Sequence, residues 1–237
     1  FGERAAGSGL DAVVINTHHH MDHTGGNFAL ADFGGRPLVA MHSVGEQRVR
    51  SSIERYRSQA QSALRSAERA EEGTRREMAV ASARAFIERA DLLSPDDFGP
   101  TRTFNEERYE IPVGRTVATL HLFCPGHTDN DTVVQLHEDN VIHCGDLLFS
   151  RMHPYFADNS GSTCRGWLNS VSRIIDLCDE QTVVVPGHGP VCDVEELKRQ
   201  ADYLDRLWRV VGTEVDRGTS RAEVITKAWD FMDGLER

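Results

Sequence analysis

Four histidines and an aspartate occur within the six residues from His18 to His23, directly after the apolar run 12–15. His18 and His20 are two residues apart, so both side chains can point the same way from an extended backbone. Asp22 and His23 follow at once and can face a second point nearby. Neutral imidazole suits zinc or iron, and a carboxylate adds charge and can orient a water molecule. The spacing therefore suits two metal ions held side by side.

The same arrangement of an apolar run followed by a His or an Asp occurs three more times along the chain. Glycine or proline stands beside each of these residues, which are His127, Asp146 and His188. If the runs are strands whose carboxyl ends meet at one edge of a sheet, all four loops come together there. A histidine-rich surface loop or an expression tag is disfavoured, because the first run is internal and is interrupted by Met21 and Asp22.

The elements that must position these residues are short strands and amphipathic helices. Apolar and β-branched runs predict strands at 11–16, 37–41, 108–111, 116–123, 132–137, 140–144 and 182–185. Helices are predicted at 3–8, 28–30, 165–178, 193–212 and 221–235, with Ser220 and Glu223 as the cap of the last one. This order predicts an α/β fold in a single domain over residues 1–237.

Residues 44–93 differ from the rest, because they are rich in helix-forming Ala, Arg, Glu and Gln. A break at 72–74 divides them into two helices, which predicts a helical hairpin inserted in the domain. Ten arginines lie between Arg48 and Arg89. They are typical of a solvated face with pairs four residues apart. The alternatives are a lid, a wall that steers anions, or the surface of a homodimer.

Composition limits the class of protein. A chain of 237 residues, 39% of them hydrophobic, can bury a sizeable core. The net charge of -11 argues against a nucleic-acid partner, and the chain has no apolar run of the length that a membrane span needs. The five cysteines are widely spaced, which is typical of buried thiols rather than a disulfide framework. The sequence does not decide between a cytoplasmic and a periplasmic location.

Taken together, the residues resemble the metallo-β-lactamase superfamily, whose signature is HxHxDH followed by a His, an Asp and a final His. Four sequence segments are similar to those of glyoxalase II and related hydrolases, namely THHHMDHTGGN, PGHT, GDLLFS and PGHG. The resemblance implies a four-layer αββα sandwich, with the insert at 44–93 and the helices at 193–237 as less typical parts. It also implies strands before the first motif, and we expect these strands to be missing from this chain.

The resemblance implies two metal sites. In the first, His18, His20 and His127 would bind one zinc ion. In the second, Asp22, His23 and His188 would bind another, and Asp146 would bridge the two. The implied chemistry is hydrolysis of a small ester, thioester, lactone or amide by a bridging hydroxide, with Asp22 as the catalytic residue that orients it or moves a proton. An aspartate at the bridge disfavours β-lactams, because true metallo-β-lactamases have Cys or Ser there.

Several alternatives remain open at this point. Iron or manganese would also suit the ligands, and an iron-dependent dioxygenase of the same superfamily would need only the first site. A non-catalytic protein that binds a metal or a partner through the hairpin is the third reading. Residues 150–156 are either a packed loop or a wall of the pocket for a small-molecule substrate, and in the second case His153 and Tyr155 bind that substrate.

Overall fold

The computed structural model describes residues 13–27, 38–69, 73–92, 99–157 and 159–231. It divides into two compact units, Phe1–Phe104 and Asn105–Arg237, and each is described by itself. The helices predicted at 3–8 and 28–30 lie outside the described residues. The single domain over 1–237 stays a prediction.

The N-terminal unit contains a parallel sheet in the order β1 (Val13–Ile15), β2 (Leu38–His42) and β3 (Arg102–Phe104). The middle strand buries Val39, Ala40 and Met41, which form the core of this sheet. Both strands predicted from the apolar runs at 11–16 and 37–41 are present, and residues 11, 12 and 37 lie outside the described residues. The histidine-rich loop leaves β1 and contains the short helix α2 (Met21–Thr24).

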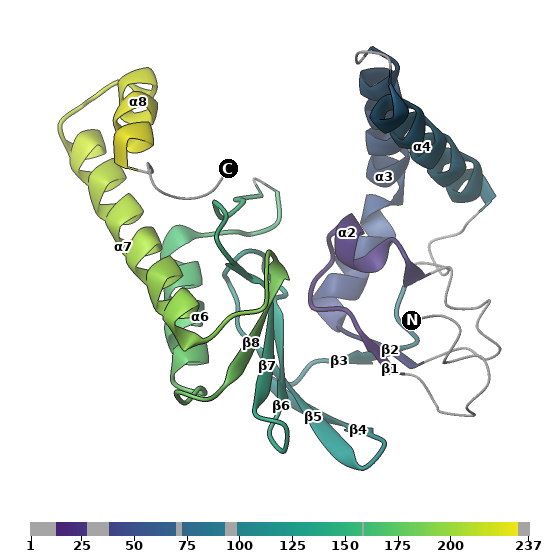
Figure 1. Ribbon diagram of the computed structural model, residues 1–237, viewed down its shortest axis with the longest axis horizontal. Helices are drawn as coiled ribbons and strands as arrows, with labels where there is room; N and C mark the ends of the chain where they lie inside the picture. Colours follow the sequence, from purple (N-terminus) through teal and green to yellow (C-terminus); the bar gives the residue numbers. More distant parts are fainter. Residues whose placement is uncertain (1–12, 28–37, 70–72, 93–98, 158, 232–237) are drawn as a thin grey trace. The chain divides into compact units, whose positions relative to one another are not determined.

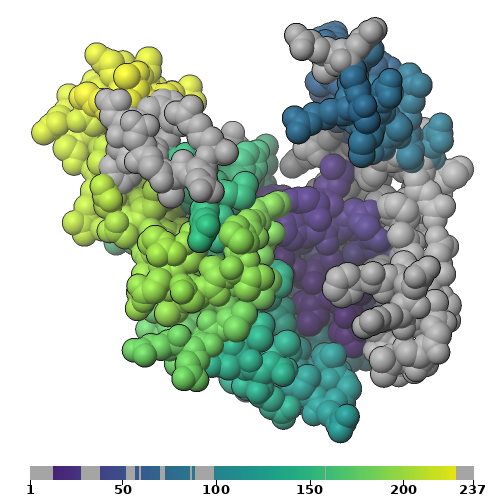
Figure 2. Space-filling model, in the orientation of Figure 1, coloured from purple at the N-terminus to yellow at the C-terminus, as the bar shows by residue number. Residues whose placement is uncertain are grey.

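The predicted helical hairpin is confirmed as α3 (Ser43–Arg69) and α4 (Thr74–Leu92), which pack along one another (Figure 1). Arg84 on α4 forms an ion pair of 3.1 Å with Glu68 on α3. Most described side chains of the two helices are exposed, and Figure 2 shows the hairpin, in blue, as open surface. This agrees with the solvated face, whereas a lid or a dimer surface stays a prediction.

The C-terminal unit is built on a five-stranded sheet, with the strands in sequence order across it. The strands are β4 (Arg108–Val113), β5 (Thr116–Leu122), β6 (Thr132–Leu136), β7 (Val141–Phe149) and β8 (Val183–His188). All neighbours are antiparallel except β7 and β8, which are parallel. As a result β5, β7 and β8 run in the same direction, and their carboxyl ends share one edge of the sheet.

Three helices complete this unit, namely α6 (Cys164–Ile175), α7 (Val194–Asp216) and α8 (Arg221–Phe231). In Figure 1, α6 and α7 lie side by side next to β7, and both contribute to its core. Trp167, Val171 and Ile174 of α6 are fully buried there, as are Leu197 and Leu204 of α7. The predicted cap of α8 is confirmed, because the Ser220 hydroxyl donates to Glu223 Oε2 at 2.7 Å.

Two details of the predicted strands need correction. The strand predicted to end before Asp146 continues to Phe149, because the apolar residues 147–149 are buried and pairing with β8 persists through register irregularities. The expectation that one sheet edge carries all four loops is also wrong. Asp146 and His188 lie on strands of the five-stranded sheet and His127 lies in the loop that follows β5, while β1 belongs to the three-stranded sheet.

No helix in the described ranges has the length and apolar character needed to cross a membrane. All five cysteines are described and carry free thiols, as their spacing predicts, but the expectation that they are buried is wrong for the four other than Cys144, which are half-buried. Cys144 is buried, and burial holds the pKa of its thiol well above the usual value.

Candidate metal centre

The histidine-rich loop of the N-terminal unit is held by two asparagine side chains. Asn16 Nδ2 donates to Asn27 Oδ1 at 3.2 Å, and Asn27 Nδ2 donates to Asn16 Oδ1 at 2.8 Å. The same Asn16 amide group donates to the backbone oxygen of His23 at 2.8 Å. Both asparagines are buried. The loop therefore closes on itself through hydrogen bonds between its two ends and with the backbone of His23.

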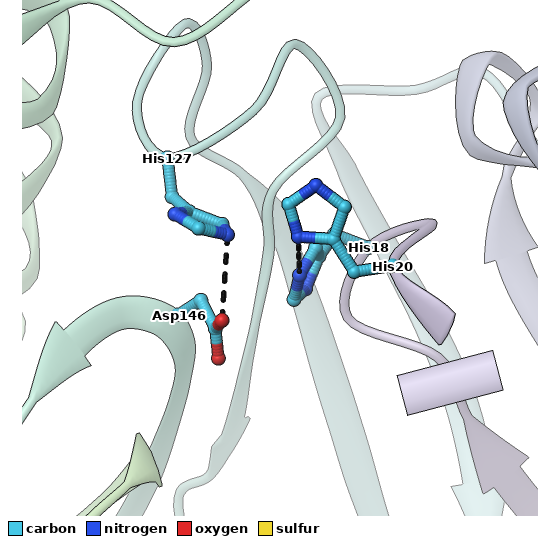
Figure 3. A group of neighbouring side chains, drawn as sticks. All are labelled: His18, His20, His127 and Asp146. Carbon is cyan, nitrogen blue, oxygen red and sulfur yellow. Dashed lines mark hydrogen bonds and ion pairs between the residues drawn. The ribbon is translucent and has the colours of Figure 1, made fainter. Parts of the chain in front are cut away.

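One ring nitrogen of His18 lies close to one ring nitrogen of His20, as the dashed line in Figure 3 shows. His18 Nε2 and His20 Nδ1 are 3.0 Å apart, and His18 Nδ1 lies 3.2 Å from the Thr17 hydroxyl. Two nitrogens at zinc-binding distance from one tetrahedral ion are about 3.3 Å apart. The observed separation is close to that value, so the pair can share one metal ion.

Asp22 and His23 lie one turn further along the same loop, on α2. His23 Nε2 is 3.4 Å from Asp22 Oδ2, and the Asp22 side chain is 55% exposed. The His23 ring lies beside that of His18, with a centroid distance of 4.2 Å. Four of the seven predicted ligands are therefore neighbours within this unit, and the carboxylate of Asp22 is open to solvent.

In the C-terminal unit, His127 is fully buried and held from both sides. Its Nδ1 lies 2.9 Å from the backbone oxygen of Tyr155, and its Nε2 lies 3.3 Å from Asp146 Oδ2 (Figure 3). A carbonyl oxygen only accepts, so Nδ1 carries the hydrogen and Nε2 faces the carboxylate. The ring also packs edge-on against Trp167, with the centroids 5.1 Å apart. This arrangement, with one nitrogen anchored and the other facing a carboxylate, is common among metal-binding histidines.

Asp146 Oδ2 is close to a second imidazole as well, because His188 Nε2 lies 3.5 Å away. The Asp146 side chain is 3% exposed, and space for it exists because residue 187 is a glycine. A Cβ at Gly187 would lie 2.0 Å from Asp146 Oδ1. The ring of His188 stacks on Phe149 at an interplanar angle of 18°. One carboxylate oxygen thus lies between the Nε2 atoms of two histidines, which suits a ligand shared by two ions.

A buried carboxylate shapes the loop that carries His127. Asp131 accepts from the Thr128 backbone N–H at 2.8 Å and from the Thr128 hydroxyl at 2.6 Å. Burial raises the pKa of the Asp131 carboxyl to about 7, against the opposing effect of these hydrogen bonds. These two contacts with Thr128 fix the loop directly after His127.

The two residues predicted to bind substrate lie on the segment between β7 and α6. The Tyr155 side chain is 65% exposed, while its backbone oxygen contacts His127. His153 is half-buried, and its ring lies 6.2 Å from that of Tyr203. Their role in substrate binding stays a prediction.

The chain is similar to known proteins in both sequence and fold. Residues 3–188 match the family model described as the metallo-beta-lactamase superfamily. The structure is similar to a metallo-beta-lactamase from Pontibacter korlensis, with 19% identity, a TM-score of 0.53, and coverage of 81% of this chain and 68% of that one. The crystal structure of VMB-1 at pH 5.5 is similar with 18% identity and a TM-score of 0.52, over 80% of this chain and 65% of that one. The crystal structure of DIM-1 metallo-beta-lactamase is similar with 16% identity and a TM-score of 0.53, over 81% of this chain and 68% of that one.

This chain spans about two thirds of the length of those structures. At such low identity the likeness shows the fold alone, and it confirms the predicted α/β class. A likeness to glyoxalase II in particular, and the absence of strands before the first motif, stay predictions.

Proposed function

Because the chain belongs to the metallo-β-lactamase superfamily, we propose that it is a metal-dependent hydrolase with two zinc ions. Its substrate would be a small ester, thioester, lactone or amide. The observation that carries this proposal is the position of Asp146 Oδ2, which is 3.3 Å from His127 Nε2 and 3.5 Å from His188 Nε2. A carboxylate oxygen this close to two imidazoles supports a ligand shared by two ions.

We assign the ligands in two sets. His18, His20 and His127 would bind the first ion. Asp22, His23 and His188 would bind the second, and Asp146 would bind both. The separations of 3.0 Å within the His18–His20 pair and 3.3 Å within the His127–Asp146 pair support this division, since each is close to that of two ligands on one tetrahedral ion.

The donor set fits zinc. Five of the seven proposed ligands are histidines, and the other two are aspartates. Imidazole nitrogens suit zinc, iron and copper better than magnesium or calcium. In the His127 ring, the donation from Nδ1 to the Tyr155 carbonyl leaves a lone pair on Nε2, directed at Asp146 Oδ2. A lone pair facing a carboxylate is repulsive unless a proton or a metal ion lies between them, and a metal ion bound here would relieve this contact.

Metal ions bound here would lower the pKa of water to about 7 and polarise a substrate carbonyl. The protein's own groups would then move a proton and limit access of solvent. Asp22 is exposed and beside His23, so it can accept a proton from water or pass one to the leaving group. The fully buried His127 and Trp167 would keep solvent away from one side of the reacting groups.

Metal analysis of protein purified without added zinc tests the proposal. About two zinc ions per chain would support it, together with metal-dependent turnover of a thioester, lactone or ester. One iron per chain and oxygen consumption with a persulfide would favour the dioxygenase instead. The substrate panel should include a β-lactam, because Asp146 stands where we expect Cys or Ser in a true β-lactamase. Chains without metal and without turnover on the whole panel would contradict the proposal.

A further inference from the structure

The segment that follows Asp146 is held by side chains from a helix about fifty residues further along the chain. On β7, the Leu147 carbonyl accepts from Trp167 Nε1 at 2.9 Å and from the side-chain amide of Gln200. The Phe149 backbone N–H donates to Gln200 Oε1 at 2.8 Å. One amide side chain therefore bonds the C=O of one residue and the N–H of the next but one, as a neighbouring strand would.

Gln200 bonds the part of β7 that extends past its pairing with β6. Among the described residues, the pairing of β7 with β6 ends at His143, whereas β7 continues to Phe149. Without a partner, a buried C=O and a buried N–H in this region would each lose a hydrogen bond. Gln200 is itself 6% exposed and reaches the strand from α7.

Glu196, one turn before Gln200 on α7, holds the next part of the segment. Its Oε1 accepts from the Arg151 backbone N–H at 2.8 Å, and its Oε2 accepts from Arg199 Nε at 2.8 Å. Between these two anchors, the Ser150 N–H donates to the His188 carbonyl at 2.9 Å. The N–H groups of residues 149, 150 and 151 therefore donate to Gln200, His188 and Glu196 in turn.

We propose that Gln200 and Glu196 are positioning residues for Asp146 and His188. The inference rests on the proposed function, because it concerns the residues that would bind the second zinc ion and bridge both. The two α7 side chains hold the backbone from 147 to 151. That backbone fixes Asp146 at one end and contacts the His188 carbonyl at the other. Loss of the anchors allows Asp146 Oδ2 to leave its position between the two imidazoles.

The test measures zinc affinity, with chelator competition, in the chain of 237 residues. Gln200→Met keeps a long buried side chain but makes no hydrogen bond, and we expect it to weaken zinc binding about 10- to 100-fold, as loss of supporting groups does in other zinc sites. Glu196→Gln keeps an acceptor for Arg151 N–H and should stay within a few-fold of the wild type, whereas Glu196→Met should not. Glu195→Ala, on the exposed side of the same turn, is the control.

A second readout separates positioning from mere stability. In the cobalt-loaded protein, the d–d absorption reports the coordination geometry at saturating metal. We expect Gln200→Met and Glu196→Met to change this spectrum and Glu196→Gln to restore it. If Gln200→Met does not fold, Glu196→Met carries the test.

The outcomes distinguish this inference from the proposed function. Wild-type affinity and an unchanged cobalt spectrum in the folded methionine variants, with only a lower melting temperature, would overturn the positioning role alone. A wild-type chain that binds two zinc ions but hydrolyses nothing would overturn the proposed hydrolysis and leave the positioning role standing. A wild-type chain that binds no zinc would overturn both.

Discussion

The Nδ1 atom of His127 lies 2.9 Å from the backbone carbonyl oxygen of Tyr155. Because the partner is a carbonyl, the contact orients the His127 ring whichever side chain stands at position 155. The Tyr155 ring itself is 65% exposed. One residue thus offers two separable properties, a backbone anchor for a metal ligand and an exposed aromatic side chain beside it.

The first prediction concerns His127 itself. His127→Ala removes a buried imidazole from the first ligand set, so we expect zinc content to fall below one ion per chain and turnover to fall by roughly a hundredfold or more. His137→Ala is the control, since His137 is exposed at the turn between β6 and β7. Plasma emission spectrometry and steady-state kinetics measure both effects. Full zinc content and turnover in the His127 variant would contradict the assignment.

Tyr155 allows its two properties to be separated. Tyr155→Ala leaves the backbone oxygen in place, so we expect zinc content to remain that of the wild type. If the ring forms a wall of the substrate pocket, KM should rise by about 3- to 30-fold, which corresponds to the loss of one ordinary apolar contact or hydrogen bond. An unchanged KM would place the substrate elsewhere, and a loss of zinc would mean that the side chain supports the site.

Gly187 is predicted to be required for its lack of a side chain. A methyl group there would lie 2.0 Å from Asp146 Oδ1 and 2.7 Å from the Gly145 carbonyl carbon, so Asp146 must move. We therefore expect Gly187→Ala to lower both zinc affinity and stability, the latter by about 1–3 kcal/mol. Gly212→Ala is the matched control, because no atom lies within 4 Å of its added methyl group. In the interior of α7 it should stabilise by about 1 kcal/mol.

Asp131 leads to a prediction about pH. Burial raises the pKa of its carboxyl to about 7 in the folded chain, whereas an unfolded aspartate titrates near pH 3.9. Between these two values the folded state binds the additional proton, so the free energy of unfolding decreases as pH rises from about 4 to 7. The loss is at most about 4 kcal/mol, at 1.36 kcal/mol per pH unit.

Urea unfolding at several pH values, with metal removed by a chelator, measures this effect. Asp131→Asn does not titrate, so its stability relative to the wild type should increase as pH rises through this window. Asn can still accept from the Thr128 N–H. Parallel pH profiles of the two proteins would show that Asp131 keeps an ordinary pKa.

Residue types and local spacing were sufficient to predict the class of fold and to select the residues that we propose as metal ligands. His18 and His20 are two residues apart in an extended segment, and His127 and His188 follow apolar runs with Gly beside them. These signals are local, because they depend on the direction of a side chain from a strand and on the chemistry of imidazole. For the same reason the helical hairpin could be predicted from composition alone.

The groups that support the ligands depend on the tertiary structure. Gln200 and Glu196 lie on a largely polar helix and look like surface residues in the sequence, yet both are buried against the strand that carries Asp146. Phe149 and Gln200 are 51 residues apart. The extension of β7 past Asp146 was missed for a related reason, since it depends on pairing with β8. Such contacts arise when burial leaves a backbone group in need of a partner, and only the folded chain decides which side chain is near enough to supply it.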